Sequence, residues 1–247
     1  MIFSLFKRKK SSTEYVSPLT VDMHSHLLPG IDDGCADFDQ SIALIEKFVE
    51  LGYKKLIMTP HVMGDFYKNT PEIILDKLDK LTDIVKNLGL PIELGAAAEY
   101  YLDESFMERL NKQEKLLSFG DRYVLFETSF MNSSPYIDTA VFQLQSLGYK
   151  PVLAHPERYT YFFDNATKLY ELQERGVHLQ VNLNSLAGYY SKPSKLIAEK
   201  LIADRKVSFL GSDCHGERHL AVLQQVRATD YYKKALSLDL LNHTLLA

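Results

Sequence analysis

Short apolar segments alternate with longer amphipathic ones along the chain from residue 20 onward. The apolar segments are bounded by turn-forming or polar residues, as buried strands commonly are. They cover residues 20–24, 55–59, 92–97, 123–127, 151–154, 178–182 and 207–211. The pattern therefore predicts seven short strands.

Between these segments, apolar residues recur every three or four positions, which predicts amphipathic helices. The predicted helices cover residues 39–51, 71–88, 137–147, 166–175 and 194–204. The first of them is followed by Gly52, a residue type that commonly ends helices. Residues 64–70, 130–135 and 183–193 are predicted to be loops.

Strands that alternate with helices favour a parallel α/β fold. A closed or nearly closed barrel fits seven strands better than a doubly wound sheet, because no Gly-x-Gly-x-x-Gly turn follows the first strand. We therefore expect one barrel domain over residues 20–247, preceded by a basic tail over residues 1–19.

The composition of the chain is that of an ordinary globular protein. Its 247 residues are 46% hydrophobic, and the net charge of −4 does not favour nucleic-acid binding, which needs a basic face. The two cysteines, Cys35 and Cys214, fit a reducing compartment such as the cytoplasm. No apolar run is long enough for a transmembrane helix. A short apolar start and the basic residues 7–10 allow membrane contact, but a solvated tail is favoured.

Imidazoles and carboxylates cluster at the carboxyl ends of the predicted strands, which meet on one face of a parallel barrel. They are His24, His26 and Asp33 near the first strand, His61 after the second, Glu99 after the third, Glu127 and His155 at the fourth and fifth, and Asp213 and His215 after the seventh. Side chains two positions apart on a strand face the same side, so His24 and His26 could reach one ion. The set suffices for two or three metal ions.

Each of these residues has a less specific explanation when it is taken alone. A single buried histidine is more often a hydrogen-bonded core residue than a ligand, and Asp32 with Asp33 could form only a turn. Taken together, however, five of the eight histidines lie at strand ends beside a carboxylate or another histidine. His178, His219 and His243 lack that context, and His178 is expected to be structural.

Four segments resemble the motifs of the polymerase and histidinol phosphatase (PHP) superfamily. They are Asp22-Met23-His24-Ser25-His26, Thr59-Pro60-His61, Ala154-His155-Pro156 and Ser212-Asp213-Cys214-His215. Within this superfamily, residues 24–34 and 155–159 resemble the bacterial manganese-dependent protein-tyrosine phosphatases of capsule and exopolysaccharide loci. The resemblance extends over nearly the whole chain after residue 20.

This resemblance implies a distorted TIM-like barrel of seven strands with three divalent ions, Mn²⁺ first and Fe, Zn or Co as alternatives. It implies a first ion on His24, His26, Glu99 and Asp213, a second on Glu99, Glu127 and His155, and a third on Asp33, His61 and His215. The phosphate-contacting arginine of the family corresponds to Arg158, with Arg218 as a second candidate. Catalytic roles would then fall to Arg158, Asp213 and His215.

The implied activity is hydrolysis of protein phosphotyrosine by a metal-activated hydroxide, with a bacterial tyrosine kinase as the substrate protein. Among the tyrosines in predicted loops, Tyr159 beside Arg158 is expected to contact the substrate, although packing at the barrel rim would explain it equally well. A thiol mechanism is excluded, because the sixth residue after Cys35 is Ser41 and the sixth after Cys214 is Leu220, where Cys-x5-Arg needs arginine. The alternatives are a small-molecule phosphatase, such as one for histidinol phosphate, and a non-catalytic metal-binding module that docks a kinase.

Overall fold

The computed structural model describes residues 18–246, so nearly all of the predicted tail, including its basic cluster, lies outside the described residues. All paired strands run parallel, in two sheets with the orders β1-β2-β4 and β3-β5-β6-β7-β8-β9. The strands are β1 Val21–Asp22, β2 Lys55–Met58, β3 His61–Val62, β4 Glu93–Ala96, β5 Glu99–Tyr101, β6 Tyr123–Glu127, β7 Lys150–Ala154, β8 His178–Asn182 and β9 Phe209–Gly211.

The strands occupy seven positions in a distorted barrel, as expected, because two of the positions are broken strands. β2 and β3 are separated by Thr59 and Pro60, and β4 and β5 by Ala97 and Ala98. Proline has no N–H to donate to a neighbouring strand, which interrupts the ladder at Pro60. The backbone nevertheless stays in register, since the Glu99 N–H donates to the carbonyl of Pro60 at 3.1 Å.

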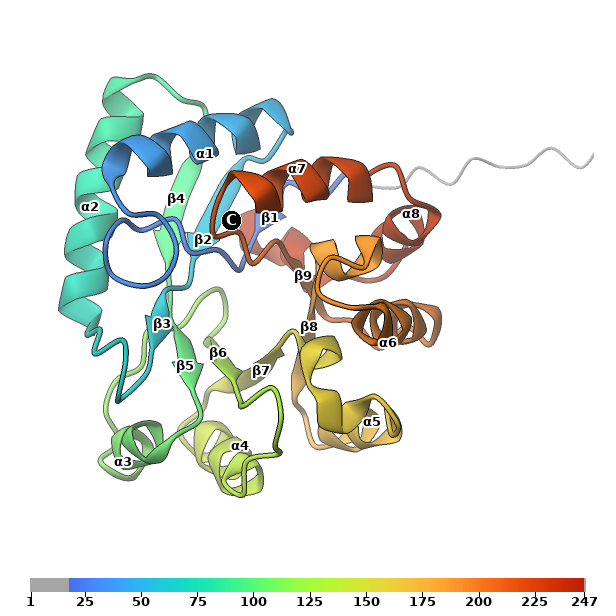
Figure 1. The fold of residues 1–247 in the computed structure, drawn as a ribbon. Coiled ribbons are helices and arrows are strands. Elements are labelled where there is room, and N and C mark those ends of the chain that lie inside the picture. Colours follow the sequence, from blue (N-terminus) through green and yellow to red (C-terminus); the bar gives the residue numbers. More distant parts are fainter. Residues whose placement is uncertain (1–17, 247) are drawn as a thin grey trace, which may run out of the picture.

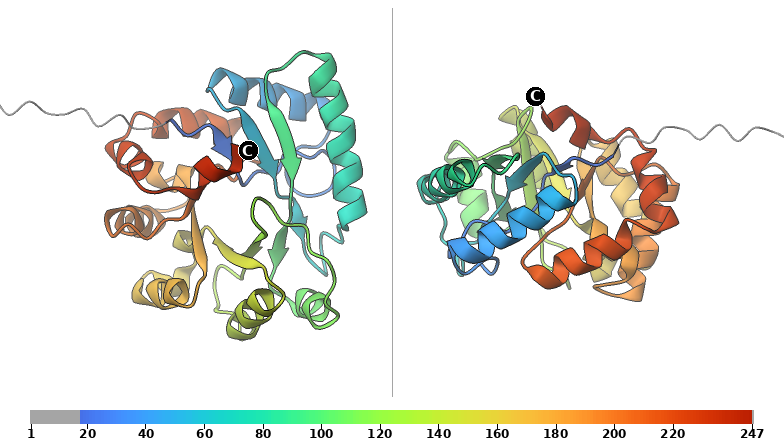
Figure 2. Two further views of the ribbon diagram at one scale, coloured as in Figure 1. Left: turned by 180° about the vertical axis from the view of Figure 1, so that it is seen from behind. Right: turned by 90° about the horizontal axis from the view of Figure 1, so that it is seen from above.

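Helices surround the strands, as Figure 1 shows, and the view from above in Figure 2 shows them outside the barrel wall. The α-helices are α1 Phe38–Glu50, α2 Pro71–Asn87, α3 Glu104–Asn111, α4 Ile137–Ser146, α5 Thr167–Glu174, α6 Lys192–Ala203, α7 Glu217–Val226 and α8 Asp230–Leu236. The 3-10 helices are η1 Pro156–Arg158, η2 Thr160–Phe162, η3 Leu183–Ala187 and η4 Leu241–Leu246.

The five predicted helices are present, but α3, α7 and α8 were not predicted. Each has ten residues or fewer, so its apolar repeat is short. The beginning of α3 is nevertheless marked by Asp103, which accepts a hydrogen bond from the Phe106 N–H as an N-cap. The prediction of a loop over residues 183–193 is partly wrong, because this segment contains η3 and the first residues of α6.

The alternation of side chains along each strand divides the barrel interior into layers. On β6, Tyr123 and Leu125 belong to an apolar cluster inside the barrel, whereas Val124 and Phe126 pack in the larger core shared with the helices. The next inward position is Glu127, at the carboxyl end of the strand. The lower interior is therefore apolar, and the carboxyl ends carry the polar residues.

The first and last strands meet at a seam held by side chains. The Ser212 N–H and hydroxyl donate to the two carboxylate oxygens of Asp22, both at 2.7 Å. Lower in the barrel, the buried Asn242 amide of η4 accepts from the Leu210 N–H at 2.9 Å and donates to the carbonyls of Val21 and Leu210. No helix within residues 18–246 has the length and apolar character needed to cross a membrane.

We expect Asn242→Ala to lower the free energy of unfolding by about 2–4 kcal/mol, because it leaves buried backbone groups on both seam strands without partners. Denaturant unfolding followed by circular dichroism measures this change. Thr244→Ala is the matched control, since Thr244 is exposed and its hydroxyl donates only to the Leu241 carbonyl. Equal stability of the two variants would show that the seam does not depend on Asn242.

Candidate metal centre

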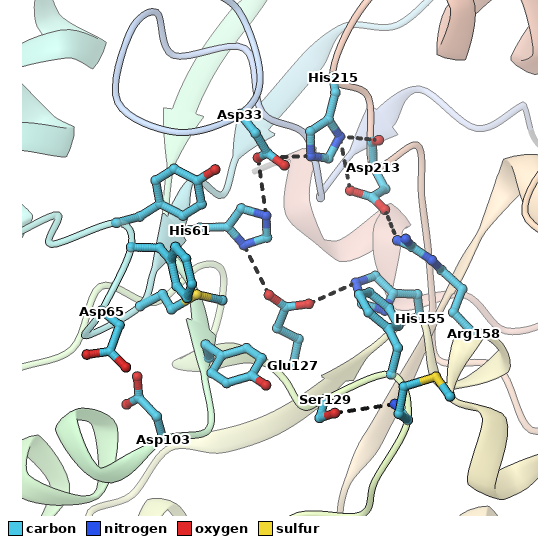
Figure 3. Close-up of a pocket in the computed structure, with 16 residues that line it drawn as sticks. Asp33, His61, Asp65, Asp103, Glu127, Ser129, His155, Arg158, Asp213 and His215 are labelled. Atoms are coloured by element: carbon cyan, nitrogen blue, oxygen red, sulfur yellow. Dashed lines mark hydrogen bonds and ion pairs between the residues drawn. The ribbon is translucent and has the colours of Figure 1, made fainter.

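All nine residues predicted as metal ligands converge at the carboxyl ends of the barrel strands. Within the described residues, histidine and carboxylate ligand atoms lie within 4.8 Å of one another in four overlapping groups. The groups are His26, Asp33, His61 and His215; His24, His26 and Asp213; His24, Glu99 and His155; and His61, Glu99 and Glu127. They border an open cavity of about 480 Å³, part of which is drawn in Figure 3.

One fully buried group combines His24, His26 and Asp213. The two Nε2 atoms are 3.3 Å apart and lie 3.5 and 3.4 Å from Asp213 Oδ1. An ion about 2.1 Å from each ligand would place neighbouring ligand atoms about 3.0–3.4 Å apart. The spacing of these three side chains therefore fits a shared divalent ion.

Glu99 lies between the groups and is completely buried. Its Oε2 is 3.2 Å from His24 Nε2 and 3.2 Å from His61 Nδ1, yet it accepts no hydrogen bond of acceptable geometry. Its Oε1 is 3.0 Å from His155 Nε2. A buried carboxylate oxygen without a hydrogen-bond partner is costly, so this position suits a carboxylate that bridges two ions.

The outer part of the centre joins Asp33, His61 and His215. Asp33 Oδ1 lies 3.4 Å from the Nε2 atoms of both histidines, an arrangement visible at the top of Figure 3. Glu127 approaches from β6, with Oε1 at 3.2 Å from His61 Nδ1 and Oε2 at 3.7 Å from His155 Nε2. These contacts connect the outer group to Glu99 through shared residues.

A second layer of side chains aims the histidines. The Nδ1–H of His24 donates to Gln180 Oε1 at 2.8 Å, and the Nδ1–H of His26 donates to Asp32 Oδ2 at 2.8 Å. Such partners leave Nε2 free and directed inward, which is how proteins orient metal-binding imidazoles. Gln180 was not predicted, although its inward position on β8 between outward Leu179 and Val181 was a usable signal.

Backbone geometry adds to this positioning. His155 and Asp213 both adopt left-handed conformations, with φ of 32° and 49°. Left-handed backbone is uncommon for residues other than glycine, although Asp and His adopt it more often than most, and it recurs at functional sites. Gly34 permits the close approach of the loop that carries Asp33, because a Cβ at Gly34 would lie 1.9 Å from the carbonyl oxygen of His26.

Electrostatic coupling shapes the charge state of the metal-free protein. Burial lowers the pKa of His24, but the Glu99 and Asp213 carboxylates outweigh burial and raise that pKa to about 9. Burial in turn raises the pKa of Glu99, but the surrounding imidazoles hold it well below its usual value. A hydrogen bond with His215 lowers the pKa of Asp33 to about 2.

Arg158 reaches the centre from η1 and is the expected arginine that the structure brings to the cavity. Its Nη1 donates to Asp213 Oδ2 at 2.7 Å, and the same oxygen accepts from Asn182 Nδ2 at 2.7 Å. Asp213 therefore presents Oδ1 to the histidines and uses Oδ2 for its own orientation. Asn182, like Gln180, is an inward residue of β8 that was not predicted.

Two expected substrate contacts are not supported by the structure. Tyr159 is completely buried, and its hydroxyl accepts from the Thr128 N–H, so it packs behind the cavity instead of lining it. Arg218 is exposed on α7, where its guanidinium lies 5.4 Å from the Tyr189 ring centroid, and it does not line the cavity. Both side chains point away because η1 and α7 fix directions that sequence proximity to the motifs does not reveal.

Two other residues have roles of a different kind. His219, which lacked ligand context in the sequence, accepts a hydrogen bond at Nδ1 from the His215 N–H at 2.9 Å and thus positions that loop. His178 lies near the amino end of β8 and packs edge-on against Tyr123, consistent with a structural residue. Cys35 and Cys214 are buried free thiols whose pKa values burial raises, which disfavours the thiolate form.

Comparisons with known proteins agree with this arrangement. Residues 20–243 match a family described as "Capsular polysaccharide synthesis, CpsB/CapC". Tyrosine-protein phosphatase YwqE of Bacillus subtilis is 33% identical over 196 residues, 79% of this chain and 77% of the relative. Tyrosine-protein phosphatase CpsB of Streptococcus pneumoniae is 28% identical over 180 residues, 73% of this chain and 72% of that protein.

A solved structure is also similar. It belongs to a study of YwqE from Bacillus subtilis and CpsB from Streptococcus pneumoniae, described as "unique metal-dependent tyrosine phosphatases". The similarity has a TM-score of 0.80 at 30% identity and covers 92% of this chain and 94% of that one. The likeness thus extends over nearly the whole fold.

We expect metal binding to release at least about one proton per chain at pH 7, because His24, with a pKa of about 9, must become neutral to bind an ion. The apparent metal affinity should therefore rise from pH 7 to pH 9. Calorimetric titrations in buffers of different ionisation enthalpy measure the number of protons released. The control His178→Gln, at the far end of the barrel, should release the same number. An observed enthalpy that is independent of the buffer would contradict this coupling.

Proposed function

Because the chain belongs to the CpsB/CapC family of capsular polysaccharide synthesis, we propose that it is a metal-dependent phosphatase that hydrolyses phosphotyrosine in proteins. Its relatives YwqE and CpsB carry the name tyrosine-protein phosphatase, and the study of their crystal structures describes them as metal-dependent tyrosine phosphatases. The observation that carries the proposal is the convergence of nine imidazole and carboxylate residues, six of which line one open cavity.

We assign three divalent ions to the centre, with Mn²⁺ as the first choice and Fe, Zn or Co as alternatives that the same ligand types accept. The first would be held by His24, His26, Glu99 and Asp213, the second by Glu99, Glu127 and His155, and the third by Asp33, His61 and His215. When bound, such ions supply Lewis-acid activation of water and of the phosphoryl group. Four carboxylates offset only part of their charge, so the centre remains attractive to a phosphate dianion.

Arg158 would bind the substrate phosphoryl group beside the metals. Nη1 is engaged by Asp213, and the remaining N–H groups of the guanidinium can donate charge-assisted hydrogen bonds to phosphoryl oxygens. Asp213 joins Arg158 to the histidine group, and His215 closes the same side of the cavity. The leaving oxygen needs little proton assistance, because a tyrosyl phenol has a pKa of about 10.

Apolar walls favour an aryl phosphate over a small polar one. Besides the candidate ligands and Arg158, the cavity lining includes Met63, Phe66, Tyr67, Tyr101 and Phe130. Phe66 is 76% exposed, so it lies at the rim, where a protein-borne residue could enter. Burial of a tyrosine ring against such walls contributes about 1.5–3 kcal/mol. This chemistry supports phosphotyrosine in preference to histidinol phosphate.

The biological setting is part of the same proposal. A bacterial tyrosine kinase would be the phosphotyrosine-bearing partner, and the pathway would be capsule or exopolysaccharide synthesis, as the family description suggests. The two buried cysteines are free, which fits the cytoplasm, where thiols stay reduced. The non-catalytic alternative receives less support, because all nine ligand candidates are retained together.

We expect metal-stripped protein to be inactive and Mn²⁺ to restore hydrolysis of a phosphotyrosyl peptide. The kcat/KM for that peptide should exceed the value for histidinol phosphate by at least about tenfold, given the burial of one aromatic ring. The assay follows phosphate release with each ion added in turn. Faster turnover of histidinol phosphate would replace the proposed substrate, and inactivity with every ion would remove the phosphatase assignment.

Replacement of a candidate metal ligand should distinguish a metal-dependent enzyme from a non-catalytic docking module. We expect His155→Ala and Glu127→Gln each to lower kcat by more than about 100-fold, the upper end of what partners outside the ligand set cost. Circular dichroism and thermal unfolding should show that the fold is retained, and His243→Gln, outside the cavity, should keep full activity. Undiminished hydrolysis in both ligand variants would mean that the centre is not the site of the reaction.

A further inference from the structure

The guanidinium of Arg158 lies between two aromatic rings that come from different parts of the chain. Its Cζ is 4.5 Å from the Phe130 ring centroid and 4.1 Å from the Tyr190 ring centroid. Phe130 belongs to the loop after β6, and Tyr190 to the segment between η3 and α6. Rings at such distances attract a cation and restrict its movement.

The two rings are themselves held in place. The Phe130 carbonyl accepts hydrogen bonds from the Thr160 N–H at 2.9 Å and the Thr160 hydroxyl at 3.0 Å. Its ring stacks on His155 with a centroid separation of 5.7 Å, and it is 37% exposed within the cavity wall. The Tyr190 hydroxyl accepts from Asn182 Nδ2 at 3.2 Å and donates to Asp213 Oδ2 at 3.4 Å.

This arrangement determines which N–H groups of Arg158 bind Asp213 and which remain free for another partner. An unrestrained arginine beside a carboxylate tends to form two parallel hydrogen bonds with it, which would engage two of its nitrogens. Here only Nη1 contacts Asp213. Asp213 Oδ1 faces His24 and His26, and Oδ2 is already shared with Asn182.

We propose that Phe130 and Tyr190 are positioning residues that form an aromatic clamp on Arg158. The clamp fixes the plane of the guanidinium, so that Nη1 stays on Asp213 while the other N–H groups remain available to the phosphoryl oxygens of the substrate. The proposal rests on the proposed phosphatase function for the identity of that substrate and for the assignment of Arg158 to its phosphoryl group. Neither ring is assigned a contact with the reacting atoms.

Equilibrium binding of inorganic phosphate to the metal-loaded protein tests the clamp without turnover. We expect Tyr190→Leu and Phe130→Leu each to raise the Kd for phosphate about 3- to 30-fold, with the metal content of the protein unchanged. Tyr190→Phe, which keeps the ring and loses the hydroxyl, should stay within about twofold of the unchanged protein. Phe142→Leu is the matched control, because Phe142 is 69% exposed on α4 and does not line the cavity.

A double-mutant cycle separates the clamp from a general structural effect. If Tyr190 acts through Arg158, Tyr190→Leu should cause no further loss of phosphate affinity in an Arg158→Met background. Additive losses would overturn the proposal, as would equal losses in Tyr190→Phe and Tyr190→Leu. If Tyr190→Leu does not fold, the same cycle with Phe130→Leu, at a partly exposed position, tests whether the clamp acts through Arg158.

Hydrolysis of the phosphotyrosyl peptide is measured on the same variants as a separate readout. If the unchanged protein binds phosphate but hydrolyses no phosphotyrosine, the proposed function fails while the clamp can still be judged from Kd. If the protein hydrolyses the peptide and the clamp variants bind phosphate normally, the clamp fails and the function stands.

Discussion

The close burial of like charges at the barrel mouth is the constraint on which the rest of the structure depends. Glu99, Glu127 and Asp213 are almost completely buried in overlapping groups of possible ligand atoms. Carboxylates at such a site repel one another and lose hydration, so the arrangement persists only with compensating partners. Neighbouring imidazoles provide this compensation, since their contacts with the carboxylates raise the pKa of His24 and depress that of Glu99.

Much of the surrounding structure holds these groups in their unfavourable arrangement. Gln180 and Asp32 fix the rings of His24 and His26, and Asn182 with Arg158 fixes Asp213. The apolar lower layer of the barrel supplies the rigidity, because its packed side chains leave the strand ends little freedom. The packed core therefore holds the second layer of side chains in place, and that layer in turn orients the candidate ligands.

The sequence predicted the barrel and the members of the cluster because both produce repeated local signals. Buried strands appear as apolar runs, and most candidate ligands lie at the end of such a run or just after it, as Glu127 and His155 do. The break at Pro60 was not foreseen as two separate strands, since an apolar run does not show where the ladder stops. Contacts across the barrel could not be predicted from the sequence either. Gln180 is 156 positions from its hydrogen-bond partner His24, and no local pattern encodes that pairing. Tyr159 was misplaced for the same reason, because its direction is set by η1 and its partner Thr128.

The seam between β1 and β9 has a consequence for the order of events during synthesis. Asp22 and Ser212 are 190 residues apart, and the Asn242 amide that joins the two strands follows later still. A nascent chain that has exposed only its first strands has His24 and His26 but lacks Asp213 and His215. The complete set of ligand atoms can assemble only after β9 and the residues that follow it have emerged from the ribosome, so full metal loading has to come late in the folding of this domain.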